Sequence, residues 1–455
     1  MKRKAVFLLC AIMLTVSPVY AEEATTEAIE ETIISAATTD ELEDIIEQDV
    51  EDTIGGLTSE YETIKETLAD FDAYLANPTL TEDFYIKTVT EINALTIRLR
   101  EYTLKYAELI MASDDDYDDK YDDLEDIYDE IYEDAAEEIY DEIYDGMLDD
   151  MYDDIYDGII DNAYENVEYS VWDDARSAEY SMWDDARSDI YSSYDDVRSD
   201  IYGFYDKTRT HVYKEHEVKV DKDIAKFQKL INKLKGIKDE SAPTIDLTNL
   251  DLASVATTEE MDAIFEADVE ATTNALWEEY AALQTEIDSY EKFKADPEKT
   301  EDFYDHVVEE VEHASGRLRE YALRYAEIIY GSGMELRDQY DEFSDIRDAV
   351  YSDAAGSLSR ELYRGLLKNA YKVFYNSILK SGFDVDSYSD VSGLRSDEYK
   401  HISNARSDVY SEISDLRSDV YSFVSDVRSA AWSQEAEKVE KEIEGFRKDT
   451  EKFNR

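Results

Sequence analysis

Residues Trp172–Glu215 read WDDARSAEYSM WDDARSDIYSS YDDVRSDIYGF YDKTRTHVYKE, which is one eleven-residue unit repeated four times. Apolar residues recur at positions one, four and eight of the units. Eleven residues over three turns correspond to about 3.67 residues per turn, so these positions form a nearly straight apolar stripe on a helix. The stretch therefore predicts a long amphipathic helix that packs on other helices.

A second copy of the pattern follows 219 residues later. TEDFY at Thr81–Tyr85 returns at Thr300–Tyr304, and ARSDIY at Ala186–Tyr191 returns as ARSDVY at Ala405–Tyr410. One offset shared by separate motifs indicates a tandem duplication without gaps. The predicted boundaries are 38–236 for the first copy, 237–256 for a Pro-containing linker and 257–455 for the second copy.

The remaining sequence of each copy also has helical periodicity. In the first copy we expect a helix over about 40–75, because the residue before Pro78 is driven out of the α region. Thr81 is the expected cap of a second helix. Three rough twelve-residue repeats follow, IYDEIYEDAAEE, IYDEIYDGMLDD and MYDDIYDGIIDN, and they predict a third helix.

The eleven-residue units would form the fourth helix of each copy. Gly158 with Asn162, and Gly382 in the second copy, are the candidates for a break before it, although the third and fourth helices could also be continuous. The predicted fold class is all-α: two tandem, elongated helical-bundle or coiled-coil domains of about four helices each, with eleven- and twelve-residue repeats.

The start of the chain has the layout of a secretory signal peptide over residues 1–21: a basic segment, an apolar run over 5–16 and Val-Tyr-Ala at 19–21. We expect an exported protein of the periplasm, cell surface or extracellular space, with an acidic N-terminal segment over 22–37. The only cysteine, Cys10, would leave with the signal, so no disulfide or cysteine-ligated metal is expected. No later segment approaches the roughly 20 apolar residues that a transmembrane helix needs.

The formal net charge of −67 argues against two classes of partner. Nucleic acids and anionic membranes are both bound through Lys and Arg, and an acidic surface repels them. Cations and basic proteins remain compatible partners, and self-association is also open. High charge is typical of disorder, but the 37 Tyr with helical periodicity and only 4 Pro favour a folded chain.

The two copies differ most in acidity. Residues 114–161 contain 24 Asp and Glu against one Lys, a net charge of −23, whereas the equivalent residues 333–380 have a net charge of −1. Three explanations remain open: binding of cations or a basic partner, a solvated acidic face, or adaptation to high salt. Like charges four residues apart destabilise a helix, so acidity that arose by neutral sequence drift would carry this cost many times over. This favours the first explanation.

Part of this acidic stretch partly fits a calcium-binding loop. Its expected ligands are Asp114, Asp116, Asp118, Asp122 and Glu125, at positions 1, 3, 5, 9 and 12. Position 6, where the loop requires Gly, is Asp instead, so weak and diffuse calcium binding is the alternative. No other cofactor is expected.

Other chemical motifs are few. His306, Glu310 and His313 share one helix face and could hold zinc, although two ordinary surface histidines explain the pattern as well. The sequence has no GxGxxG, P-loop, HExxH or GxSxG motif. We therefore expect no catalytic residues and no enzyme activity.

Each eleven-residue unit places Arg four residues before an aromatic residue, as in Arg187–Tyr191. Residues four apart share a helix face, so we expect the guanidinium to lie over that ring. The leading functional prediction is an exported, non-enzymatic structural or interaction protein. The alternatives are an acidic calcium-binding protein centred on residues 114–161 and an amphipathic lipid-binding protein.

Overall fold

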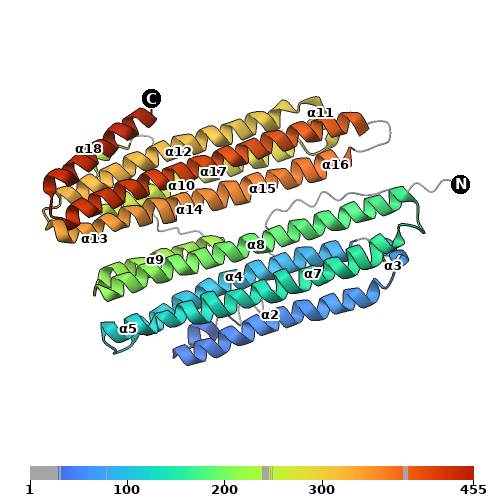
Figure 1. The fold of residues 1–455 in the computed structure, drawn as a ribbon, viewed down its shortest axis with the longest axis horizontal. Helices are drawn as coiled ribbons and strands as arrows, with labels where there is room; N and C mark the ends of the chain where they lie inside the picture. Colours follow the sequence, from blue (N-terminus) through green and yellow to red (C-terminus); the bar gives the residue numbers. More distant parts are fainter. Residues whose placement is uncertain are drawn as a thin grey trace. The chain divides into compact units, whose positions relative to one another are not determined.

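The computed structural model describes residues 29, 32–77, 79–237, 245, 247, 250–382 and 388–454. All regular secondary structure in these residues is helical, which confirms the all-α prediction. The chain divides into two compact units, unit 1 within Met1–Glu240 and unit 2 within Ser241–Arg455 (Figure 1). The predicted signal peptide lies outside the described residues, as do most of segment 22–37 and part of the predicted linker. None of the described helices is long and apolar enough to cross a membrane.

Unit 1 contains a segment in which the helix changes type several times. This segment, residues 117–160, alternates α-helical turns with π-helical turns and is called the wide helix below. Its α-turns are α5 (Tyr117–Asp123), α6 (Ala136–Ile139) and α7 (Leu148–Met151), and its π-turns are η1 (Ile127–Ala135), η2 (Tyr140–Met147) and η3 (Tyr152–Ile160). The other elements are α2 (Thr39–Thr67), α3 (Phe71–Ala76), α4 (Leu80–Ala112), the 3₁₀ turn η4 (Asp161–Ala163), α8 (Tyr169–Tyr213) and α9 (Glu217–Leu234).

Unit 2 has the same order of elements, with a wide helix over residues 336–381. Before and after it lie η6 (Leu252–Ser254), α10 (Thr258–Glu286), α11 (Tyr290–Ala295), α12 (Glu298–Gly331), α17 (Tyr388–Trp432) and α18 (Ala436–Phe453). The wide helix itself consists of α13 (Leu336–Arg347), η7 (Asp348–Ala354), α14 (Ala355–Leu358), η8 (Ser359–Leu366), α15 (Leu367–Ala370), η9 (Tyr371–Ile378) and α16 (Leu379–Ser381).

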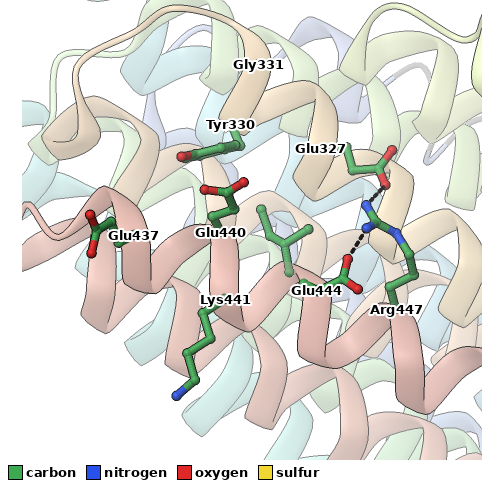
Figure 2. Close-up of a pocket in the computed structure, with 9 residues that line it drawn as sticks. Glu327, Tyr330, Gly331, Glu437, Glu440, Lys441, Glu444 and Arg447 are labelled. Atoms are coloured by element: carbon green, nitrogen blue, oxygen red, sulfur yellow. Dashed lines mark hydrogen bonds and ion pairs between the residues drawn. The ribbon is translucent and has the colours of Figure 1, made fainter.

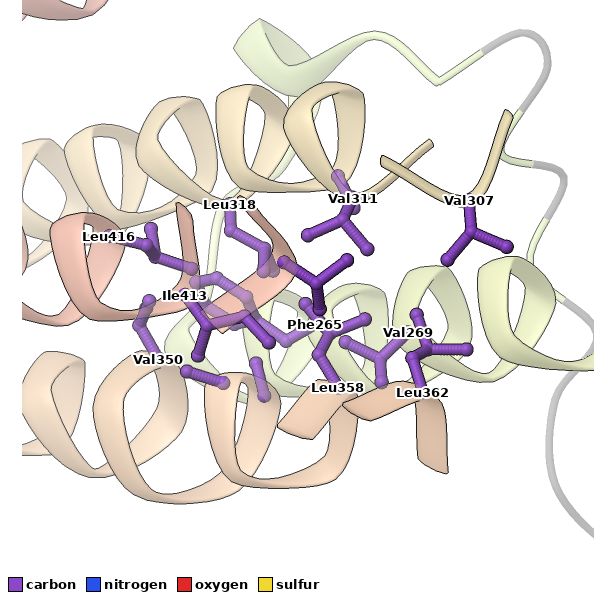
Figure 3. Packing of buried hydrophobic residues seen from close by; sticks show 14 of the residues in the cluster. Phe265, Val269, Val307, Val311, Leu318, Val350, Leu358, Leu362, Ile413 and Leu416 are labelled. Atoms are coloured by element: carbon purple, nitrogen blue, oxygen red, sulfur yellow. The ribbon is translucent and has the colours of Figure 1, made fainter. Parts of the chain in front are cut away.

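Four long segments enclose the core of each unit. Figure 3 shows this for unit 2, where Phe265 of α10, Val311 of α12, Leu358 of the wide helix and Ile413 of α17 point toward one another. All four side chains are buried. Burial of a side chain of this size stabilises the fold by about 1.5–3 kcal/mol, so these apolar stripes hold the helices together.

The twelve-residue repeats explain why the wide helix contains π-turns. Its buried residues occur at every fourth position, as at Ile127, Ile131 and Ala135 and again at Ile139, Ile143 and Met147. In an α-helix four residues turn about 400°, so such a stripe would drift by about 40° at each step. A π-turn holds more residues than an α-turn, because its hydrogen bonds join residues five apart. The wider turns cancel the drift and keep the stripe on one face.

Two predicted helix boundaries are wrong. The first helix was expected over about 40–75, but α2 ends at Thr67 and α3 begins after Asp70, whose side chain accepts a hydrogen bond from the N–H of Ala73. This cap starts a new helix, although no Pro or Gly marks the position. Thr81 is not the cap of the second helix. It lies inside α4, where its buried hydroxyl donates to Glu179.

The number of helices per unit was also underestimated. Glu215 and Gln434 have positive φ values of 56° and 57°, and each turns the chain into a further helix, α9 and α18 respectively. The third and fourth helices are not continuous in unit 1, where Asn162 lies in a 3₁₀ turn just after η3 and donates a hydrogen bond to the carbonyl of Gly158. In unit 2 Gly382 ends α16, as the sequence suggested.

Candidate functional site: an arginine–aromatic ladder

In each unit the helix of eleven-residue repeats packs along the wide helix, and a regular set of arginines and aromatic rings lies between them. We call this set the ladder. In unit 1 it is formed by α8 and the wide helix, which contact each other over all three π-turns (Figure 1). Eleven residues of α-helix rise about 16.5 Å, so successive rungs of the ladder are separated by roughly that distance.

Each ladder arginine of unit 1 lies over a tyrosine of the wide helix. The guanidinium-to-ring distances are 4.9 Å for Arg176–Tyr156, 4.4 Å for Arg187–Tyr144, 4.1 Å for Arg198–Tyr132 and 4.0 Å for Arg209–Tyr121. The arginines are eleven residues apart, whereas the tyrosines that they meet are twelve, twelve and eleven residues apart in the opposite direction. The two helices therefore run antiparallel and stay in register although their repeats differ by one residue.

The second ring against each guanidinium is four residues earlier in α8, not four residues later. Arg187, for example, lies 5.1 Å from the ring of Trp183, and Arg176 lies 5.3 Å from that of Trp172. The predicted pairing of Arg187 with Tyr191 is thus wrong. The reason is geometric: Cα–Cβ bonds in a helix tilt toward its N-terminus, so a long side chain covers the turn that precedes it.

The aromatic residues four positions after each arginine form the exposed edge of the ladder. We call them the outer rings: Tyr180, Tyr191, Tyr202 and Tyr213, which are 45%, 48%, 47% and 70% exposed. Each contacts the wide helix edge-on or tilted; the ring centre of Tyr191 lies 6.4 Å from that of Tyr140 and 5.7 Å from that of Tyr144. Tyr140 and Tyr144 are themselves stacked at 4.8 Å. The outer rings are therefore held in place by neighbouring rings.

Carboxylates of the wide helix and of the turn after it hold three of the arginines. Arg187 pairs with Asp149 at 2.7 Å, Arg176 with Asp161 at 2.8 Å and Arg209 with Glu125 at 2.9 Å. The indole N–H of Trp183 donates to the backbone carbonyl of Leu148 at 2.9 Å. Three of the four rungs thus combine stacking with directional bonds to the wide helix or to the turn after it.

Unit 2 has the same ladder with fewer rings. Its guanidinium-to-ring distances are 4.2 Å for Arg395–Tyr375, 4.9 Å for Arg406–Tyr363, 5.1 Å for Arg417–Tyr351 and 4.2 Å for Arg428–Tyr340. The outer rings are Tyr399, Tyr410, Tyr421 and Trp432, between 52% and 61% exposed. Two stacked pairs of unit 1 are incomplete here, because Arg347 and Ser359 occupy the positions equivalent to Tyr128 and Tyr140.

The five predicted calcium ligands lie at the start of the wide helix. Asp116 caps α5 by accepting hydrogen bonds from the N–H groups of Asp118 and Asp119, and Asp122 lies within the same helix. Glu125 is paired with Arg209. Within the described residues, no group of three or more His, Cys, Asp or Glu is placed to hold a metal ion. The structure therefore does not bring these five residues together as one ligand set.

The acidic stretch instead faces other carboxylates. Glu43 of α2 lies near Asp126 and Glu130 of the wide helix, and Glu51 lies near Glu138. Partial burial, followed by the repulsion of these neighbours, raises the pKa of Asp126, Glu130 and Glu138 above the ordinary range. Unit 1 therefore carries electrostatic repulsion between α2 and the wide helix that protons or cations would relieve.

A buried carboxylate at the end of the ladder was not anticipated. Glu179, 1% exposed, accepts hydrogen bonds from the hydroxyls of Tyr74, Thr81 and Tyr85 at 2.9–3.1 Å. Burial raises the pKa of Glu179 above its ordinary value. The sequence held a signal: Glu179 occupies position eight of its eleven-residue unit, where the other three units of this copy have Ile or Val.

Glu398 of unit 2 occupies the equivalent position. It is buried and accepts hydrogen bonds from Thr300 at 2.8 Å and Tyr304 at 2.6 Å. A buried carboxylate that is bonded in the same way in both units is explained by the fold, so we assign it a structural role.

The described part of unit 2 has two further polar surfaces. On α12 His313 is exposed and His306 is half-buried, and Glu310 between them lies 3.7 Å from a ring nitrogen of His306 and 3.6 Å from one of His313. A groove of about 570 Å³ lies between α12 and α18, and in it Arg447 bridges Glu327 and Glu444 (Figure 2). Unit 1 has Ala225 and Gln228 in place of Glu444 and Arg447, so the order of helices that the two units share does not require this bridge.

Comparison of the chain with protein-family models, with curated proteins and with solved structures finds no match.

Proposed function

We propose that the chain is an exported, non-enzymatic interaction protein made of two tandem copies of one helical domain. The observation that carries this proposal is the ladder: a row of half-exposed aromatic rings, fixed by stacking and ion pairs, on long helices in both units. Exposed Tyr and Arg are enriched in protein interfaces, because they combine a large apolar area with polar groups. A rigid surface of this kind is suited to binding along a length of helix.

The buried polar contacts support the tandem duplication. In unit 1 Arg98 forms a two-pronged ion pair with Asp49, which also accepts a hydrogen bond from Tyr102. In unit 2 Arg317, Asp268 and Tyr321 form the same contacts 219 residues later. A buried carboxylate requires an ion pair of accurate geometry, so the repetition of this pair on buried Asp49 and Asp268 at one offset supports a common ancestor domain.

Cell fractionation tests the interaction function. The producing cell would express the full chain, or a variant in which the outer rings Tyr191, Tyr202, Tyr410 and Tyr421 are replaced by Ser. These side chains are exposed, so circular dichroism of the purified variant should match the parent. We expect the parent chain to associate with an envelope fraction and the variant to be released from it. Equal partitioning of the two proteins would contradict the proposal.

A second candidate function is binding of cations by unit 1. It is supported by the carboxylates that face each other between α2 and the wide helix, where repulsion raises three pKa values. Any cation that binds the folded unit preferentially stabilises it. A calcium site at Asp114, Asp116, Asp118, Asp122 and Glu125 stays a prediction within this candidate.

A further inference from the structure

The ladder of unit 1 is an aromatic surface within a strongly negative segment. Its wide helix lies in the stretch 114–161, with 24 carboxylates and one Lys. Three of the four ladder arginines, Arg176, Arg187 and Arg209, are paired with Asp161, Asp149 and Glu125, so most of the positive charge of the ladder is already compensated. The electrostatic potential around the outer rings is therefore negative, because carboxylates outnumber basic groups in this segment.

The contacts within the ladder indicate which kind of ligand group its rings bind. On their inner side, the tyrosines of the wide helix are covered by guanidinium groups of the same chain at 4.0–4.9 Å. Cations are attracted to the faces of Tyr rings, and negative charge nearby adds a Coulomb attraction. The outer rings have the same chemistry, but about half of Tyr180, Tyr191 and Tyr202, and more of Tyr213, is open to solvent.

We propose that the unit 1 ladder binds an extended cationic peptide segment, with Arg or Lys side chains placed over successive outer rings. This inference rests on the interaction function proposed above and names its partner. Successive rungs are about 16.5 Å apart. An extended chain rises about 3.3 Å per residue, so this distance corresponds to roughly five residues of the partner, but successive side chains of an extended chain point to opposite faces. To face successive rings, the basic residues of the partner would therefore follow one another at even intervals, alternately about four and about six residues.

Unit 2 provides the matched control. Its outer rings are equally exposed, but the stretch around its wide helix has a net charge of −1, and two of the stacked tyrosine pairs are incomplete. The ring positions Tyr410 and Tyr421 are equivalent to Tyr191 and Tyr202. A peptide attracted by both aromatic rings and negative charge should therefore discriminate between the two ladders.

The test uses the mature full-length chain and a fluorescein-labelled peptide of Gly and Ser with four Arg at successive intervals of about four, six and four residues, which keeps them on one face of an extended chain. Fluorescence anisotropy at fixed ionic strength gives the affinity. Replacing Tyr191 and Tyr202 by Ser should weaken binding roughly 5–30-fold, the product of two exposed cation–π contacts. The same changes at Tyr410 and Tyr421 should alter the affinity less than about twofold. Phe at positions 191 and 202 keeps the rings and should retain most of the affinity, which separates ring loss from misfolding.

Two further peptides complete the experiment. A peptide with the same composition but its four Arg together at one end should bind at least several-fold more weakly, and a peptide with Gln in place of Arg should not bind. The proposal is overturned if the clustered peptide binds as tightly as the spaced one, or if the unit 1 and unit 2 substitutions have equal effects. Either result would overturn the peptide-binding proposal without contradicting association with the envelope, which cell fractionation tests separately.

Discussion

The guanidinium of Arg187 lies 4.4 Å from the ring centre of Tyr144, and the next contact along the ladder joins Arg198 to Tyr132. Between these contacts α8 advances eleven residues and the wide helix twelve. Both helices complete about three turns over this distance, because the π-turns accommodate the extra residue. The π-turns thus keep the ladder in register, and changes to them should affect the whole unit.

Two glycine substitutions test the role of the π-turns. A Cβ atom at Gly146 would lie 3.0 Å from the carbonyl oxygen of Asp141, whereas one at Gly203 in α8 would meet nothing within 4 Å. Gly146→Ala should therefore destabilise the protein by about 1–3 kcal/mol through overpacking. Gly203→Ala should stabilise it by about 0.5–1 kcal/mol, because Ala lowers the entropic cost of forming a helix. Denaturant titrations measure both; equal effects would contradict this account of the wide turns.

The buried ion pair between Asp49 and Arg98 should be essential to unit 1. Both side chains are less than 10% exposed, so Asp49→Ala would leave an uncompensated buried guanidinium at a cost of about 3–5 kcal/mol. The exposed pair of Glu60 with Lys87 is the control, and Glu60→Ala should cost less than about 1 kcal/mol. Chemical denaturation distinguishes the two. A change in the free energy of unfolding for Asp49→Ala as small as that for Glu60→Ala would contradict this prediction.

Stability should fall as pH rises from acid to neutral. Burial raises the pKa of Glu179, so the folded state binds its proton more tightly than the unfolded state does. The stabilisation is fully present below the ordinary pKa of Glu and is lost as pH rises through the raised folded-state pKa. Partial burial and neighbouring carboxylates shift Asp126, Glu130 and Glu138 in the same direction.

Substitution isolates the contribution of Glu179 to this trend. Glu179→Gln should reduce the slope of melting temperature against pH as pH rises above the ordinary pKa of Glu, and Glu398→Gln in unit 2 should do the same. Both side chains are buried, and both pKa values are raised by that burial. Melting curves at several pH values measure the slope, and an unchanged slope in both variants would refute the assignment.

Calcium should stabilise the first copy more than the second. Fragments 38–236 and 257–455 contain the core of each unit apart from Ile33 and Ala36 in unit 1 and Val255 in unit 2, so we expect each fragment to melt cooperatively on its own. Ligand binding raises stability by RT ln(1 + [L]/Kd), about 2.7 kcal/mol at a hundredfold excess over Kd. Melting in millimolar calcium and in sodium chloride of equal ionic strength gives the comparison, since monovalent salt also screens. Equal shifts of the melting temperature in both fragments would indicate that the acidic residues 114–161 form a solvated face with no preference for calcium.

Periodicity was sufficient to predict the helical fold but not the type of helix. Spacing of apolar residues is visible in the sequence, and it correctly indicated helices throughout the described residues. The interval of four between Ile127, Ile131 and Ala135 was also visible, and only π-turns keep such an interval on one face. The break at Asp70 depends on a single side-chain cap, which competes with helix continuation by a small free-energy difference.

The ladder was only half predictable. Its arginines and outer rings are prominent in the eleven-residue repeats, but their partners Tyr121, Tyr132, Tyr144 and Tyr156 lie in another repeat, and no local rule pairs the two. The backward tilt of side chains in a helix could have excluded the ring four residues later. Glu179 required tertiary information, because its three hydroxyl partners come from α3 and α4.

The pairing of eleven residues with twelve also restricts how such a protein can change in length. An insertion or deletion in α8 alone would move every later arginine away from its tyrosine, and the same holds for the wide helix. Only a matched change preserves all contacts, eleven residues in α8 together with eleven or twelve in the wide helix, as in the three intervals of unit 1. Size would therefore be expected to vary in whole rungs of about 16.5 Å. Related chains, or engineered ones, should form a discrete series of lengths rather than a continuous range.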